Sequence, residues 1–477
     1  MTARSTSVSP PATEPGRWLE RLSLWHAAVL AVAITWGFGG NIDWIRLPLA
    51  LWSSLAALLI GAGLLQRHRQ QQGGTQRLLW LLPWVALTTL TWLASTNPSY
   101  RVTAFFETPV YRPVAPAISW LPSSARPDLA RSELWLLSGL YLTGFNLVLN
   151  IRRRRRLRQL LGLLAANAAL LAVFGTVQKL TDASGLYFGA QPSPNPAFFA
   201  SFIYKNHWSA FALLLLPVLL ALAWYQFDRD NAQPFMRTPG PVLLLAALLL
   251  AVTIPLSGSR SGTLLLFLYV FGLAVAAYRR RQGWANLGAR ARIGLIAGAA
   301  LALGGVVWLT APAMSARLDK TREQLEEWRE VGGLGGREIL YRDTWRMARE
   351  RPWTGWGLES YETVFVRFNS ATSPHDHLRV HFDQAHSDWL QAMAELGAIG
   401  TCLLLLMALV PLWSLRAQWS HLDAIPCSLL SGCGLIVLYA TIEFPLANPA
   451  VVALFWILFF GALRYIQLSA RPACSRS

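Results

Sequence analysis

One short polar block of this 477-residue chain, SGSRSG, places a single arginine between two long apolar runs. The residues beside Arg260 are Gly and Ser, which permit a tight turn with free backbone amides, and amides next to a guanidinium suit a phosphate oxygen. The alternative is an ordinary turn whose arginine extends to lipid headgroups. We favour phosphate binding because the neighbouring short turns carry so little charge.

A second block, YKNHW, has Lys205, Asn206 and His207 where an apolar helix should begin. A cation and an amide at a helix start can hold an anion through side chains and free N–H groups together. Lys205 and Trp208 could equally be interfacial anchors, and both interpretations stay open.

A third block, AHSDWLQ, contains His386. Asp388 followed by Gln391 resembles a capping box, so we expect a helix to begin at Asp388 with His386 just before it. A helix N-terminus disfavours imidazolium, which would leave this histidine able to accept a proton. The open alternative is a structural histidine.

A fourth block, GGREILYRDTW, places Arg337 at the start of a predicted helix over 337–351, where anion binding is natural. Arg342 falls on an arginine face that, in isolation, is typical of a solvated or headgroup-facing surface. We expect the opposite face to carry Tyr341, Trp345 and Ala348. Partners for these arginines could be Glu395 or Glu443, which lie near the ends of apolar runs.

Metal and nucleic-acid chemistry are not favoured. The histidine-rich stretch HDHLRVH, which includes His375, His377 and His381, lacks carboxylate or cysteine partners at ligand spacing, so we predict no metal site. The net charge of +17 is concentrated in arginine clusters between apolar runs, which indicates membrane topology rather than nucleic-acid binding.

With 54% hydrophobic and only 14% charged residues, the chain has the composition of an integral membrane protein. We predict an all-α polytopic fold with about twelve transmembrane helices and a helical loop domain outside the cytoplasm. The predicted spans are 22–40, 46–65, 78–95, 133–150, 159–180, 207–226, 241–257, 262–278, 293–310, 389–413, 425–443 and 450–468.

The arginine clusters also predict orientation. Placing both termini in the cytoplasm puts every dense cluster on that side and the polar insert on the other. The predicted parts are a disordered N-terminus 1–20, transmembrane helices 21–310, a periplasmic loop domain 311–388, further transmembrane helices 389–468 and a cytoplasmic tail 469–477. We expect an amphipathic helix over 315–331 and, because of its prolines, irregular or re-entrant structure over 96–132.

The blocks YKNHWSAFALLLLP, SGSRSG, GREILYRDTWRMARERPWTGWGLESYETVF, AHSDWLQAMAELGAIG and EFPLANPA, in this order, resemble the O-antigen ligase and polymerase superfamily, the Wzy_C or WaaL-like proteins. The resemblance implies a GT-C-like inner-membrane glycosyltransferase, metal-independent, inverting and without a cofactor. Its donor would be an undecaprenyl-diphosphate-linked glycan and its acceptor lipid A-core or a growing glycan, at the periplasmic face of the lipid bilayer.

Carried over by motif, Arg260 resembles the diphosphate-binding arginine and His386 the catalytic histidine of the family. Lys205, Arg337 and Arg342 match basic positions that would bind the donor diphosphate, and Asn206, His207 and Asp388 would support the site. HSD stands here where HND is more frequent. Two alternatives remain: a protein O-oligosaccharyltransferase, and a transporter or flippase, against which the lack of an internal repeat counts.

Overall fold

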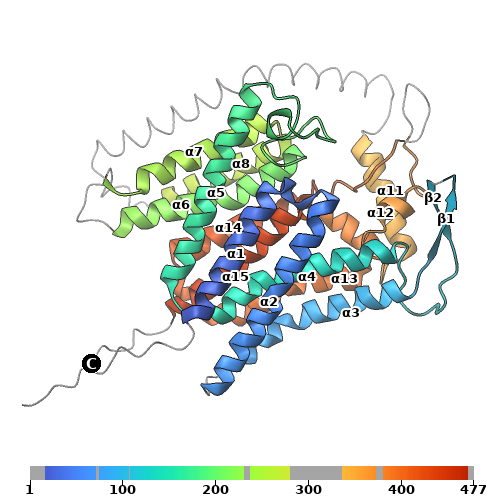
Figure 1. Ribbon diagram of the computed structural model, residues 1–477, viewed down its shortest axis with the longest axis horizontal. Coiled ribbons are helices and arrows are strands. Elements are labelled where there is room, and N and C mark those ends of the chain that lie inside the picture. The colour runs from blue at the N-terminus through green and yellow to red at the C-terminus, as the bar shows by residue number, and fades with distance from the viewer. Residues whose placement is uncertain are drawn as a thin grey trace, which may run out of the picture.

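The computed structural model describes residues 17–70, 75–106, 108–229, 237–279, 336–371 and 380–470. Helices dominate these residues (Figure 1). The α-helices are α1 (Arg17–Trp36), α2 (Asp43–Arg69), α3 (Leu82–Thr96), α4 (Pro127–Asn150), α5 (Arg154–Leu180), α6 (Lys205–Arg229), α7 (Gly240–Ser257), α8 (Arg260–Arg279), α11 (Gly336–Glu350), α12 (Tyr361–Phe365), α13 (Asp388–Ser414), α14 (Ala424–Tyr439) and α15 (Pro449–Ser469). Two strands, β1 (Tyr100–Phe105) and β2 (Thr108–Pro113), form an antiparallel pair.

Seven helices of the described residues are long and apolar enough to cross a membrane, and two shorter helices are also apolar. The seven are Asp43–Arg69, Gln76–Thr96, Arg154–Leu180, Lys205–Phe227, Gly240–Ser257, Asp388–Ser414 and Pro449–Ser469. A helix overlaps every predicted span except 293–310, which lies outside the described residues, as does the amphipathic helix expected over 315–331. The chain is therefore an all-α polytopic membrane protein, as its sequence predicted.

Helix α15 lies at the centre of the bundle, packed against α4 and α14 (Figure 1). Its apolar window is entirely buried. Gly144 of α4 allows the backbones of α4 and α15 to lie close together, because a Cβ at this position would lie 2.5 Å from the Trp456 carbonyl oxygen of α15. A side chain there would force the two helices apart, so dense packing depends on this glycine.

The loop domain has its own small apolar core, to which the hairpin β1–β2 contributes Tyr100. The regular hairpin corrects the expectation of irregular structure for residues 100–113, where Tyr100 pairs with Pro113 and Phe105 with Thr108, whereas residues 114–126 form no helix or strand. The prolines are compatible with strands here because each strand of a two-stranded ribbon has a free edge that requires no amide donor.

Helix α11 confirms the predicted helix within one residue at each end but presents a different face to the core. Leu340 and Met347 are buried, whereas Trp345 is 48% exposed. The core face also holds Asp343, which is fully buried and accepts hydrogen bonds from the backbone and hydroxyl of Ser370. Of the expected face, Ala348 is in the core and Tyr341 packs against it, whereas Trp345 is exposed; a count of apolar residues could not place the buried aspartate.

Helix α13 is broken at Gly397, whose φ of 65° and ψ of −172° are not helical. The segment 352–357 of the loop domain supplies the missing backbone partners. Four hydrogen bonds join it to α13: Trp356 N to Ala394 O (3.1 Å), Gly357 N to Glu395 O (2.8 Å), Ala398 N to Pro352 O (2.8 Å) and Ile399 N to Trp353 O (3.1 Å). The loop domain is thus fastened to a membrane helix through its main chain.

Candidate active site

The carboxylate of Glu443, in the loop between α14 and α15, joins side chains from distant parts of the chain. It is 2% exposed. One oxygen, Oε1, accepts a hydrogen bond from Arg337 Nη2 at 2.5 Å and one from Ser261 Oγ at 3.4 Å. The other, Oε2, lies 3.5 Å from His386 Nδ1. Three of the four polar blocks therefore meet at this one carboxylate.

The SGSRSG block forms the turn between α7 and α8. Gly258 ends α7 in the left-handed conformation, with φ of 82°, and α8 begins at Arg260. The hydroxyls of Ser259 and Ser261 lie 2.9 and 3.5 Å from the Tyr439 hydroxyl. Arg260 itself is exposed and pairs with no carboxylate among the described residues, and its neighbour Ser261 contacts Glu443.

The YKNHW block reaches the same place through Phe444, the residue after Glu443. The Tyr204 ring stacks on the Phe444 ring at 5.2 Å, and His207 Nε2 lies 3.2 Å from the Phe444 carbonyl oxygen. Asn206 Nδ2 donates to the Tyr204 hydroxyl at 2.8 Å. Lys205 starts α6 between these contacts and is half-buried. The block therefore lies against the Glu443 loop, and Asn206 and His207 shape it.

His386 has a strained backbone, with φ of 50°. Such a conformation costs a residue other than glycine about 1–3 kcal/mol unless its surroundings hold it. Two hydrogen bonds do so: the Tyr341 hydroxyl donates to the His386 carbonyl at 2.8 Å, and the Ala385 amide donates to Gln391 Oε1 at 3.0 Å. The His386 ring meets the Phe444 ring edge-on at 4.9 Å. The imidazole is thereby directed at Glu443.

The helix after His386 begins at Asp388, as predicted, but its cap is Ser387. Ser387 Oγ accepts from the Leu390 amide, so the expected capping box is displaced by one residue. Both residue types cap helices well, and sequence alone could not choose between them. Asp388 instead accepts from the Leu446 amide at 2.8 Å and donates its own amide to the Glu443 carbonyl. It ties the Glu443 loop to His386.

Arg342 lies in a different environment from Arg337. Its Nη2 donates to Ser370 Oγ at 2.9 Å and its Nε lies 3.4 Å from Asp343 Oδ1. A separation of five residues turns a side chain about 140° around a helix, so α11 cannot direct both arginines at Glu443. The structure brings Arg337 and His386 together at Glu443 and places the neighbours of Arg260 and Lys205 against the same loop, whereas Arg342 lies beside the loop-domain core.

The charged side chains of the site stabilise one another's ionised forms. Burial raises the pKa of the Glu443 carboxyl, but His386 and Arg337 lower it by more, so its net pKa lies below the ordinary value. Burial lowers the pKa of the Arg337 guanidinium, and Glu443 raises it by more. The Arg337–Glu443 pair is therefore fully charged at neutral pH.

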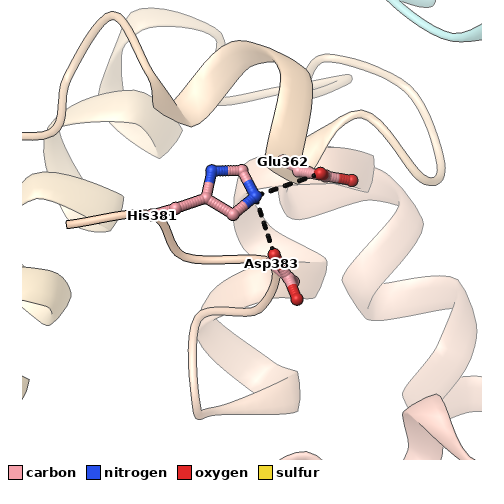
Figure 2. Close-up of side chains that lie close together, drawn as sticks. All are labelled: Glu362, His381 and Asp383. Atoms are coloured by element: carbon pink, nitrogen blue, oxygen red, sulfur yellow. Dashed lines mark hydrogen bonds and ion pairs between the residues drawn. The ribbon is translucent and has the colours of Figure 1, made fainter. Parts of the chain in front are cut away.

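A separate group on the loop domain has the composition of a cation site. His381 Nε2 lies 2.8 Å from Asp383 Oδ1 and 3.2 Å from Glu362 Oε1 (Figure 2). Sequence spacing did not indicate this group, because Glu362 of α12 is brought beside His381 and Asp383 only by folding. All three side chains are exposed and already contact one another, so we assign no metal to them. His375 and His377 lie outside the described residues.

Sequence reasoning named Glu395 and Glu443 as arginine partners without choosing. The structure selects Glu443, whereas Glu395 accepts the amides of Glu359 and Tyr361 at 3.0 Å each. The contact of Tyr341 with His386 was missed, because these residues are 45 positions apart and no local pattern links them.

One comparison with known proteins finds a match in this chain. A family model described as O-Antigen ligase matches residues 244–405, from within α7 to within α13. This stretch includes Arg260, Arg337 and His386, whereas Lys205 and Glu443 lie outside it. No curated protein matches the chain. Residues 244–405 of this multi-pass membrane protein are therefore similar to the O-antigen ligase family, in agreement with the resemblance of the sequence blocks.

Proposed function

We propose that the protein transfers a glycan from an undecaprenyl-diphosphate-linked donor to an acceptor hydroxyl at the periplasmic face of the bacterial inner membrane. The acceptor is lipid A-core or a growing glycan. The observation that carries the proposal is that Arg337 and His386 meet at Glu443, while Ser261, next to Arg260, and Tyr204, next to Lys205, contact the same loop. Cations beside an imidazole fit a reaction whose leaving group is a diphosphate.

In this reaction the acceptor oxygen attacks the anomeric carbon, and the bond from that carbon to the diphosphate oxygen breaks. The electron pair leaves with undecaprenyl diphosphate, whose developing charge Arg260, Lys205 and Arg337 offset; stabilisation made in the transition state is what raises the rate. His386 accepts the proton of the acceptor hydroxyl, a contribution of about two to four orders of magnitude. One displacement inverts the anomeric centre, and the protein cations take the place that a metal would have.

The orientation of the chain fits a periplasmic site. Arg154, in the cluster between α4 and α5, lies 3.7 Å from Asp423 and donates to the Leu468 carbonyl. These residues lie at the start of α14 and the end of α15, opposite the Glu443 loop that joins the two helices. The arginine cluster and the site are thus about one helix length apart, and the positive-inside rule puts the cluster in the cytoplasm.

The deciding experiment gives purified protein a lipid-linked glycan and an acceptor in detergent. Formation of a glycosidic bond supports the proposal and excludes a pure transporter or flippase, because no membrane barrier remains. If no bond forms with lipid A-core, a growing glycan or a protein acceptor, the proposal fails.

Ligase and polymerase use the same donor chemistry, so the acceptor must be identified in cells. Mass spectrometry of surface glycan from a deletion strain separates the two functions. Core without O-chain, together with accumulated free polymer, identifies a ligase, and core bearing one repeat identifies a polymerase. Loss of glycan from proteins alone identifies a protein O-oligosaccharyltransferase.

A further inference from the structure

The two oxygens of the Glu443 carboxylate have different partners. Oε1 accepts from Arg337 and Ser261, whereas Oε2 faces His386 Nδ1. Neither Oε2 nor His386 Nδ1 has a hydrogen bond among the described residues. At 3.5 Å the two atoms are a small movement short of a good hydrogen bond. One oxygen is fully engaged and the other is placed for a contact that it does not yet make.

The exposed fractions of Arg337 and Glu443 indicate which of the two side chains an anion from solvent would reach first. The Arg337 side chain is 54% exposed, while the Glu443 carboxylate that it covers is 2% exposed. An anion from solvent therefore meets the guanidinium first and competes with Glu443 for its N–H donors. A diphosphate offers more charge and more acceptor oxygens than a carboxylate, and guanidinium binds phosphate well.

We propose that Glu443 is a positioning residue that occupies the anion position at Arg337 until the donor diphosphate displaces it, and then engages His386. This inference rests on the proposed function. Once Arg337 turns to the diphosphate, the buried Glu443 carboxylate keeps the Ser261 hydroxyl as a neutral partner and the imidazole as its one ionisable partner among the described residues. It accepts the Nδ1–H hydrogen bond of His386 and leaves Nε2 as the proton acceptor.

The exchange couples donor binding to activation of the acceptor hydroxyl. The proton of that hydroxyl passes to His386 Nε2 as the new glycosidic bond forms, and the resulting imidazolium is neutralised by Glu443. When undecaprenyl diphosphate leaves, the proton returns to solvent and Arg337 regains Glu443. In the absence of donor the carboxylate is held by Arg337, so its contact with the imidazole stays at 3.5 Å, longer than a good hydrogen bond.

Glu395 shows what a structural carboxylate looks like in the same chain. It is buried like Glu443, yet both its oxygens accept backbone amides, and it contacts no arginine and no histidine among the described residues. Glu443 differs by facing two ionisable side chains of the proposed site and by holding one buried oxygen without a hydrogen bond. The difference argues for a partner exchange rather than for a fixed support.

The test measures binding of undecaprenyl diphosphate without a glycan, and transfer kinetics, on the same purified proteins. Glu443→Gln removes a like charge and loosens the hold on Arg337, so undecaprenyl diphosphate should bind roughly fivefold tighter, as expected for one partly solvated charge. The same variant should lower kcat roughly ten- to a hundredfold, because His386 loses its orienting carboxylate. Glu443→Asp keeps the charge and should restore wild-type binding and part of kcat.

Glu338→Gln is the matched control, since Glu338 is exposed on the same helix as Arg337 and should leave both quantities unchanged. Unchanged or weaker binding of undecaprenyl diphosphate by the Glu443→Gln protein would overturn the exchange, while transfer by the wild-type protein would still uphold the proposed function. If the wild-type protein neither binds undecaprenyl diphosphate nor forms a glycosidic bond, both proposals fall.

Discussion

Tyr341 offers a test of how His386 is held, because it touches the histidine only through the backbone. Its hydroxyl donates to the His386 carbonyl at 2.8 Å. The φ of 50° at His386 stores about 1–3 kcal/mol of strain, and one hydrogen bond contributes about 0.5–1.5 kcal/mol net. Tyr341→Phe removes that bond and leaves the ring in place, so the strained conformation loses a large part of its support.

The lost 0.5–1.5 kcal/mol corresponds to a roughly two- to tenfold lower population of the productive histidine. We therefore expect kcat for glycan transfer by Tyr341→Phe protein to fall by this factor, with an unchanged KM for the donor. The assay is transfer from lipid-linked glycan by purified protein in detergent, with donor concentration varied.

Tyr361→Phe is the matched control. The Tyr361 hydroxyl lies 2.7 Å from the Thr344 hydroxyl inside the loop-domain core, without contact to His386. Its loss should lower the melting temperature and leave kcat near the wild-type value. Wild-type kcat in the Tyr341→Phe protein, or equal losses of kcat in both variants, would refute the reasoning.

Three further predictions concern binding, packing and pH. Arg337→Ala should raise the donor KM roughly tenfold, the loss expected for one charge-assisted hydrogen bond, while Arg349→Ala on the same helix leaves it unchanged in the same assay. Gly397→Ala should lower the thermal midpoint and impair loop-domain docking, because the added Cβ would lie 2.4 Å from the Trp353 carbonyl oxygen at a φ of 65°. The pKa of Glu443 is lowered in the folded protein, so its pairing stabilises the fold above the unfolded pKa of about 4.5. This stabilisation is lost as the pH falls through the folded pKa. Thermal melts should therefore show that the melting temperature falls more steeply with acid for wild type than for Glu443→Gln.

The membrane helices could be predicted because a span needs only a long apolar run, and composition records this directly. Helix 337–351 was also predictable from its flanking GGLGG and Pro352. The break in α13 was not: MAELGAIG is compatible with a continuous helix, and only the arrival of segment 352–357 gives the freed amides and carbonyls new partners. Such backbone contacts leave no periodic signal in the sequence.

The candidate site also has residues that the sequence indicates and contacts that only the fold reveals. Arg260 and His386 could be chosen because each is a polar residue at the edge of an apolar run. The pairing of Arg337 with Glu443 joins residues 106 positions apart, and Glu395 was an equal candidate until the fold separated them. The family resemblance named Arg342 together with Arg337, but the helix directs Arg342 at Ser370 instead. Residue type suggests the chemistry, and three-dimensional packing determines which of the candidate residues contact one another.

The most direct test of the central claim compares purified wild-type, Arg260→Ala and His386→Ala proteins in the detergent transfer assay, with membrane abundance measured for each. We predict that both variants are as abundant as wild type and that transfer falls by about two to four orders of magnitude for His386→Ala, the range of a proton-transfer catalyst. Arg260→Lys should recover only part of the activity lost in Arg260→Ala, because a point charge lacks the bidentate fork. Wild-type transfer by either alanine variant would contradict a shared site for Arg260 and His386.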